Sequence, residues 1–272
     1  MMTYFLDSHL DSGDIYSPLG NSAAKRQRPS RREGIHLLTE KLSVPKYRGL
    51  VARPRLDELL SRSIEQFPAT LISGRAGTGK TALASTFARS QQHAAWYSVE
   101  SSDIEWNVFI HYFAAGVLRA VKSKAKPKDL LPTNAEPNQS SMASSLISIF
   151  AEAETELLHE PLLIVLDGIH CLFDAPWFGE FFGLLLSSLP ENTNLLLLCR
   201  SKPPSPLWRL RSKQQLHVID EKLLAFTLPE TVELVTKLGL KRSDAERAHA
   251  DTFGRVSKLL EVADRGSAKR RL

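Results

Sequence analysis

Residues 69–84 read Ala-Thr-Leu-Ile-Ser-Gly-Arg-Ala-Gly-Thr-Gly-Lys-Thr-Ala-Leu-Ala, and this stretch decides the fold. Gly74, Gly79, Lys80 and Thr81 match the spacing G-x-x-x-x-G-K-[ST] of a phosphate-binding loop. The short apolar run before the loop predicts a buried strand, and the residues after it carry apolar side chains at helical spacing. Strand, loop and helix in this order are the context in which the motif binds phosphate.

The residue types of this loop suit a nucleoside di- or triphosphate. Glycines permit backbone angles that are closed to other residues, so successive N–H groups can turn towards a phosphate, and the helix that follows adds its positive end. We expect Lys80 to reach the β- and γ-phosphates and the Thr81 hydroxyl to hold Mg²⁺. A glycine-rich turn that happens to contain a lysine is the alternative, which the flanking strand and helix disfavour. The expected nucleotide contacts are Gly74, Arg75, Ala76, Gly77, Thr78, Gly79, Lys80, Thr81 and Ala82.

The composition is that of an ordinary globular chain. Its 272 residues are 43% apolar and 24% charged, which allows one sizeable core and a small appended domain. The two cysteines, Cys171 and Cys199, have neither a disulfide pattern nor metal-ligand spacing, which favours a reducing cytoplasm. No apolar run is long enough for a membrane span, and the N-terminus lacks a signal pattern. These features predict a cytoplasmic protein with no membrane partner.

The net charge of +5 lies in the two ends of the chain. Residues 1–34 carry +1 and residues 265–272 carry +4, so residues 35–264 are neutral overall. A basic stripe across the folded part, the usual footprint of nucleic-acid binding, is therefore not expected. We interpret residues 1–40 as a flexible basic arm and residues 265–272 as a basic tail. A nucleic-acid contact by these ends is the alternative to plain solvation.

Strands that alternate with helices predict an α/β fold, with a parallel sheet of about five strands and helices on both faces. The expected strands are 69–72, 94–98, 161–167, 194–199 and 216–219. Ser102 and Asp103 are expected to cap a helix, and the prolines from Pro203 to Pro206 predict an extended segment. Short helices from Thr227 to Asp264 form a cap. We therefore expect a nucleotide-binding domain over residues 41–226 and a helical cap over residues 227–264.

Three further side chains are candidates for the site. Asp167 ends the continuous apolar run 161–167, where a carboxylate beside a phosphate loop holds Mg²⁺; an acid that only caps the turn is the alternative. Arg200 follows the strand 194–199 and would face the γ-phosphate, as a nucleotide sensor or in a structural ion pair. Arg53 precedes the helix that leads into the first strand, and it either contacts the base or is a plain surface arginine.

Several stretches together resemble one family, the STAND signalling ATPases. They are Leu50-Val-Ala-Arg-Pro-Arg-Leu, the phosphate loop, Ala-Trp-Tyr-Ser-Val-Glu, Leu-Asp-Gly-Ile-His, and Leu-Leu-Cys-Arg-Ser-Lys-Pro-Pro-Ser-Pro-Leu-Trp-Arg-Leu-Arg. Residues 41–264 are similar to the nucleotide-binding module of the large ATP-binding, LuxR-family transcription regulators of the maltose-regulon activator type. The resemblance implies a P-loop fold with sheet order 5-1-4-3-2, Arg200 as sensor, and ATP or ADP with Mg²⁺. It also implies a protein partner or self-association in the ATP state, and the chain is expected to lack the DNA-binding domain of full-length relatives.

Two departures from the family pattern bear on activity. Relatives usually carry a second acid after the strand-ending Asp, and Gly168 stands there, which predicts slow or absent hydrolysis. The family's Gly-x-Pro contact in the cap falls at Gly254-Arg255-Val256, without the proline. The leading hypothesis is an ATP/ADP-dependent switch. The alternatives are an active ATPase that drives remodelling, with Glu100 or Asp103 as base, and a nucleic-acid-binding protein that uses its basic ends.

Overall fold

Five strands pair in parallel to form one sheet in the computed structural model, which describes residues 35, 37–47, 49–133 and 136–269. The strand order is β2-β3-β4-β1-β5. Read from the other edge, this is the order 5-1-4-3-2 that the family resemblance implied, and the α/β P-loop fold is confirmed. The strands are β1 (Ala69–Ser73), β2 (His93–Ser98), β3 (Leu162–Asp167), β4 (Thr193–Cys199) and β5 (Leu216–Ile219).

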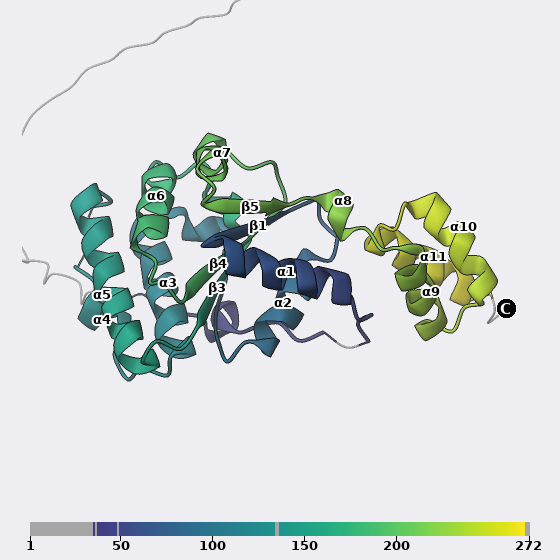
Figure 1. The fold of residues 1–272 in the computed structure, drawn as a ribbon, viewed down its shortest axis with the longest axis horizontal. Coiled ribbons are helices and arrows are strands. Elements are labelled where there is room, and N and C mark those ends of the chain that lie inside the picture. Colours follow the sequence, from purple (N-terminus) through teal and green to yellow (C-terminus); the bar gives the residue numbers. More distant parts are fainter. Residues whose placement is uncertain (1–34, 36, 48, 134–135, 270–272) are drawn as a thin grey trace, which may run out of the picture. The chain divides into compact units, whose positions relative to one another are not determined.

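Helices cover both faces of the sheet (Figure 1). Side chains of α1 (Pro54–Gln66) and α2 (Lys80–Ser90) pack on one face. The other face is covered by α3 (Trp106–Ala120), α5 (Gln139–Leu157) and α6 (Phe178–Ser188). The continuous apolar run of β3 serves both faces, because its alternate residues join the two buried clusters in turn.

Short elements fill the connections, and two of them differ from the sequence expectation. Pro204 is extended, as predicted, but Pro206 lies in the first turn of α7 (Ser205–Ser212), where a helix tolerates proline. Ser102 and Asp103 do not cap α3 but belong to the 3-10 turn η2 (Ser101–Ile104), and α3 begins after it at Trp106. The remaining short elements are η1 (Thr39–Leu42), α4 (Pro127–Leu130), η3 (Ile169–Leu172) and α8 (Glu221–Leu224).

Three helices follow the sheet: α9 (Leu228–Lys237), α10 (Arg242–Thr252) and α11 (Val256–Lys269). Thr227 starts α9 through a capping box, in which its backbone N–H donates to Glu230 Oε2 over 2.9 Å. Buried apolar side chains of all three helices pack together with Phe226 and Val51. We refer to these helices as the cap. The domain boundaries drawn from the sequence stay predictions, and residues 1–34, 36 and 270–272 lie outside the described residues.

The register of the sheet assembles the site at one edge. Asp167, the last residue of β3, is level with Ser98 of β2 and Leu198 of β4. Ser73, the last residue of β1, is level with Cys199. The loops that follow these four strands therefore meet at the carboxyl edge of the sheet, where open α/β sheets bind their ligands.

Candidate functional site

The loop between β1 and α2 contains three glycines, and only two of them adopt a backbone conformation that favours glycine. Gly77 and Gly79 adopt φ values of +74° and +87°, as the sequence predicted. Gly74 does not, and for this residue the expectation was wrong: its φ is not positive. A Cβ at Gly74 would lie 3.2 Å from both Glu221 Cβ and Thr78 Oγ1, so close packing accounts for glycine there.

Lys80 lies inside this loop. Its side chain is 6% exposed, and Nζ donates to the carbonyl oxygens of Gly74 and Arg75, over 2.5 and 2.8 Å, and to Thr78 Oγ1 over 3.2 Å. Burial lowers the pKa of Lys80, and the nearby Arg200 acts in the same direction. A buried ammonium that is satisfied only by neutral oxygens fits an anionic ligand, because a phosphate would supply the opposite charge that it lacks.

Asp167 and Thr81 come together beside the loop, as predicted for a magnesium site. A hydrogen bond from the Thr81 side chain, together with the charges of Lys80 and Arg200, favours the ionised carboxylate, but burial outweighs them and raises the pKa of Asp167. One carboxylate and one hydroxyl fit Mg²⁺, which takes few protein ligands and completes its shell with substrate phosphates and water. Among the described residues, no three His, Cys, Asp or Glu side chains could hold a metal ion by themselves.

Arg200 lies in a cavity of about 460 Å³ beyond Asp167. The side chain is exposed, and the cavity is lined by residues that follow β2, β3 and β4, among them Glu100 and His170. The Nδ1 atom of His170 is buried without a hydrogen-bond partner. Burial and the charge of Arg200 lower the pKa of His170, which favours the neutral imidazole. Asp167, which accepts the hydrogen bond from the Thr81 side chain, forms part of the wall of this cavity.

Arg53 is not a plain surface arginine. It is 8% exposed, and Nη2 donates to Glu230 Oε2 over 3.1 Å and to the carbonyl oxygens of Leu224 and Ala225 over 2.8 and 3.0 Å. Its Nε is buried without a partner. Arg53 also lines a cavity of about 350 Å³ that reaches Gly79 at the start of α2. The residue therefore combines an ion pair to the cap with a place in the wall of a cavity beside the phosphate loop.

The cap touches the phosphate loop through the connection between α10 and α11. Arg255 Nη2 donates to the carbonyl oxygen of Ala76, and the Ser257 backbone N–H donates to that of Gly77, both over 3.1 Å. Val256 lies between them in the chain, at the position of the missing family proline, and lines the 350 Å³ cavity. These bonds join the cap to the backbone of the loop. Whether the cap also contacts the nucleotide without the family proline stays a prediction.

Glu221 is a loop neighbour that the sequence analysis missed. Its carboxylate accepts the backbone N–H of Arg75 over 3.0 Å and forms an ion pair with the Arg75 guanidinium, whose Nη2 lies 2.7 Å from Oε1. The hydrogen bond from the Arg75 side chain lowers the pKa of Glu221 to about 2. Glu221 follows β5 closely, as Asp167 ends β3. The available signal was the pair of acids, Asp220 and Glu221, that follows a predicted strand.

The comparisons with known proteins agree with this geometry. The family model of the AAA ATPase domain matches residues 53–198, which is more than half of the chain. A Walker-type ATPase of Pyrococcus abyssi is similar at 16% identity and a TM-score of 0.52, over 84% of this chain and 78% of that one. A STAND protein with a tetratricopeptide repeat sensor from Pyrococcus horikoshii is similar at 18% identity and a TM-score of 0.55.

These likenesses show the fold, and the family match adds the nucleotide-binding function. The second alignment covers 80% of this chain but only 30% of the STAND protein. No helix in the described ranges has the length and apolar character that a membrane crossing requires. From the phosphate loop, the strand order and the family match together, the chain belongs to the AAA ATPase domain family, as a P-loop nucleotide-binding module.

Proposed function

We propose that this chain is the nucleotide-dependent switch module of a STAND-type signalling protein of the transcription-regulator kind. The observation that carries the proposal is the direct contact between the cap and the phosphate loop. The carbonyl oxygens of Ala76 and Gly77 accept hydrogen bonds from Arg255 and from the Ser257 backbone. Any rearrangement of the loop on phosphate binding changes these two bonds, so the cap responds to what the loop holds.

Each candidate site residue has a defined part in this proposal. Lys80 binds the β- and γ-phosphates, together with the N–H groups of the loop. Thr81 and Asp167 hold Mg²⁺, which neutralises phosphate charge when bound. Arg200 faces the γ-phosphate from the end of β4 and distinguishes ATP from ADP. The close association of Asp167 with Thr81, Lys80 and Arg200 supports this assignment.

The 350 Å³ cavity is the proposed place of the adenine base. Its walls include the apolar side chains of Val51, Leu83, Phe226 and Val256, and such a lining suits a planar aromatic ring. Arg53 is part of the same wall, with its guanidinium over the Phe226 ring. The same Arg53 forms an ion pair with Glu230 of the cap. Base binding and cap position are therefore linked through one side chain.

The proposal also gives the switching a direction. A ligand shifts a conformational equilibrium only by its differential affinity for the two states. We propose that ADP leaves the cap on the loop, as it is in this structure, whereas ATP displaces it. The ATP state then exposes the surface that binds a protein partner or a second copy of the chain. The neutral charge of residues 35–264 gives no support to a nucleic-acid partner for this part.

Equilibrium titration with labelled nucleotides tests this function. Purified protein is titrated with ATP, ADP and GTP, with and without Mg²⁺. We expect adenine nucleotides to bind and to depend on Mg²⁺, and we expect Lys80→Ala and Asp167→Asn to weaken ATP binding. The coupling to the cap is tested with Arg255→Ala, whose effect on the ratio of ATP to ADP affinity should be at least about fivefold, the lower end of typical allosteric coupling.

Arg242→Ala is the matched control. Arg242 is an exposed arginine of the same cap, at the start of α10, and it makes no contact with the phosphate loop among the described hydrogen bonds. Its substitution should leave both affinities unchanged. An affinity ratio that is the same in wild type and Arg255→Ala would refute the cap coupling. Indifference of wild type, Lys80→Ala and Asp167→Asn to all three nucleotides would refute the whole proposal.

A further inference from the structure

The cavity beyond Asp167 holds one other acidic side chain among its lining residues, Glu100. Glu100 follows β2, the strand that pairs with β3, and the pairing continues past Asp167 because the Val99 backbone N–H donates to the Asp167 carbonyl oxygen over 2.7 Å. Glu100 is therefore one residue beyond the point at which the two strand ends are bonded. Its side chain is 61% exposed.

Gly168, the position of the missing second acid, has no room for one. Its φ is +93°, and a Cβ there would lie 2.6 Å from the Val99 carbonyl oxygen. The neighbouring strand end occupies the space that a side chain at position 168 would need. The residue that follows Val99 on that strand end is Glu100. A carboxylate is thus supplied from the adjacent strand to the same cavity.

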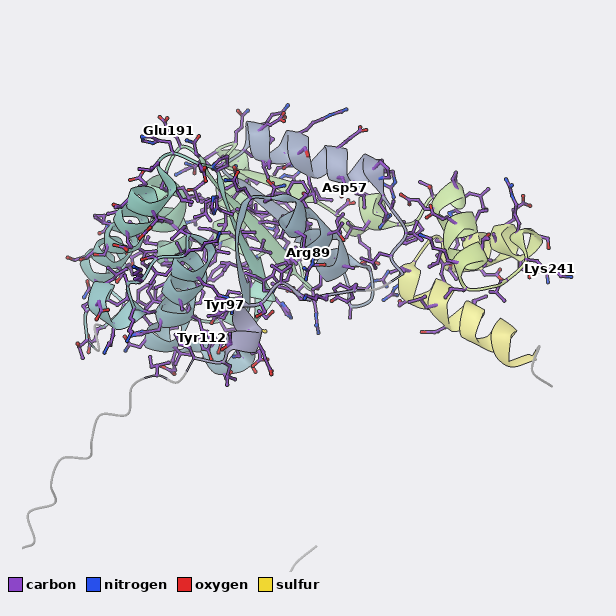
Figure 2. The ribbon with its side chains drawn as sticks, turned by 90° about the horizontal axis from the view of Figure 1, so that it is seen from below. Asp57, Arg89, Tyr97, Tyr112, Glu191 and Lys241 are labelled. Carbon is purple, nitrogen blue, oxygen red and sulfur yellow. The ribbon has the colours of Figure 1, made fainter. Side chains whose placement is uncertain are left out.

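Asp103, the other acid near the end of β2, is fully engaged. It is 1% exposed, and its two oxygens accept from Lys41 Nζ over 2.7 and 2.9 Å and from the Glu100 backbone N–H over 2.9 Å. The same Lys41 holds Glu100, with Nζ 2.9 Å from Oε2. Lys41 is itself fixed over the ring of Tyr112, which stacks on Tyr97 in the core. The two tyrosines are labelled in Figure 2. Glu100 is thereby tethered at the cavity while most of its side chain faces solvent.

We propose that Glu100 is the general base that activates water for ATP hydrolysis in this module, an inference that rests on the proposed nucleotide function. The Glu100 carboxylate takes a proton from a water molecule whose oxygen forms the new bond to the γ-phosphorus. The bond from that phosphorus to the β,γ-bridging oxygen breaks, and its electron pair stays with ADP. The products are ADP and inorganic phosphate, and Glu100 later returns its proton to solvent. Hydrolysis of ATP with Glu100 as base returns the switch to its ADP state.

His170 is the rival group in the same cavity. The Nδ1 atom of His170 is buried without a partner. Glu100 is the carboxylate that lines this cavity together with Asp167 and Arg200. The two candidates differ in their chemistry and can be separated by isosteric changes. Glu100→Gln and His170→Gln each remove the proton acceptor. Glu105→Gln is the matched control, because Glu105 is an exposed glutamate five residues further on that does not line the cavity.

The experiment is single-turnover ATP hydrolysis, measured beside the dissociation constant for ATP. We expect Glu100→Gln to lower the rate about 100-fold or more, the usual contribution of a general base, while ATP binds within about threefold of wild type. Glu105→Gln should change neither quantity.

Each other outcome has a defined meaning. A Glu100→Gln rate equal to that of wild type overturns the proposal, and so does a greater loss in His170→Gln than in Glu100→Gln. Wild type that binds ATP but does not hydrolyse it also overturns the inference, and leaves the switch function standing. Wild type that binds no nucleotide refutes the proposed function itself, and this inference falls with it.

Discussion

The backbone N–H of Ser257 donates to the carbonyl oxygen of Gly77 over 3.1 Å, and this bond joins the last helix of the cap to the phosphate loop. The two residues are in close contact beyond the bond. A Cβ at Gly77 would lie 2.6 Å from Ser257 Cβ and 2.8 Å from its Oγ. The loop can approach the start of α11 this closely only because position 77 has no side chain.

The Gly77→Ala variant tests this contact. We expect the cap to be displaced from the loop and the protein to be destabilised for two reasons. Alanine at a φ of +74° costs about 1–2 kcal/mol in backbone strain, and the new methyl group also collides with Ser257. The measurements are the free energy of unfolding in urea and limited proteolysis of the connection between α10 and α11.

A double mutant separates the two effects. Ser257→Gly removes both atoms with which the new methyl group collides, so Gly77→Ala/Ser257→Gly should be free of the collision and keep the strain. The Ser257→Gly single variant supplies the cost of glycine in a helical turn, at most about 1 kcal/mol. Strictly additive free energies in the four proteins would show that the two side-chain positions do not meet, contrary to the structure.

Glu230 connects two arginines of the nucleotide-binding part to the cap. Its carboxylate lies 3.1 Å from Arg53 Nη2 and 3.0 Å from Arg55 Nε, and its side chain is 10% exposed. We expect Glu230→Ala to lower the free energy of unfolding by about 3–5 kcal/mol, because it leaves the buried Arg53 without its counter-charge. Chemical denaturation, followed by circular dichroism, measures this change.

Glu233→Ala is the control on the same helix. Glu233 pairs with Lys237 over 2.8 Å, but both side chains are more than 40% exposed. An exposed pair of this kind contributes about 0.3–0.5 kcal/mol. Equal losses in the two variants would contradict the structural distinction between a buried ionic connection to the cap and a solvated pair.

The ion pair of Arg75 and Glu221 predicts an unusual titration. Glu221 has a pKa of about 2 in the folded protein, below the ordinary 4.5, chiefly because of the hydrogen bond from the Arg75 side chain. Since the folded-state pKa is the lower one, the stabilisation is present above about pH 4.5 and is lost as the pH falls towards 2. We expect Arg75→Ala to raise the pKa of Glu221, as observed by NMR of its carboxyl carbon. Arg62→Ala, which removes an exposed arginine paired with Glu58, should not affect it. A wild-type Glu221 that titrates near 4.5 would contradict the ion pair.

Much of the fold could be predicted because its signals are local. The apolar run that ends at Asp167 and the strand 216–219 coincide with β3 and β5 within one residue. Pro204 is extended as predicted, but the helix α7 was missed because Pro206 was also expected to extend the chain. Proline also fits the first turn of a helix, and the buried Leu207 and Leu210 hold α7 against the core. The packing partners of those leucines could not be read from the segment itself.

The site was predicted where chemistry and chain position coincide, and missed where partners are distant in sequence. The loop, Asp167 and Thr81 lie at strand and helix ends, which the strand order brings together. Arg53 meets Glu230, which is 177 residues away, and Lys41 meets Asp103, which is 62 residues away. No local pattern indicates that either residue is buried in an ion pair. The tether of Glu100 was therefore visible only in the structure.

Gly168 provides a last test, of whether the second acid is absent by steric necessity. Its φ of +93° and the Val99 carbonyl oxygen, 2.6 Å from the site of a Cβ, both oppose any side chain. Gly239 is a control with a similar φ of +76° and no atom within 4 Å of the corresponding position. Gly239→Ala should therefore show backbone strain alone, about 1–2 kcal/mol.

We expect Gly168→Ala to lower the thermal midpoint further than Gly239→Ala does. We expect Gly168→Asp to be destabilised as well, without gaining ATPase activity. A Gly168→Asp protein as stable as wild type, with faster hydrolysis, would show that the position accepts an acid and that Glu100 is not needed in its place.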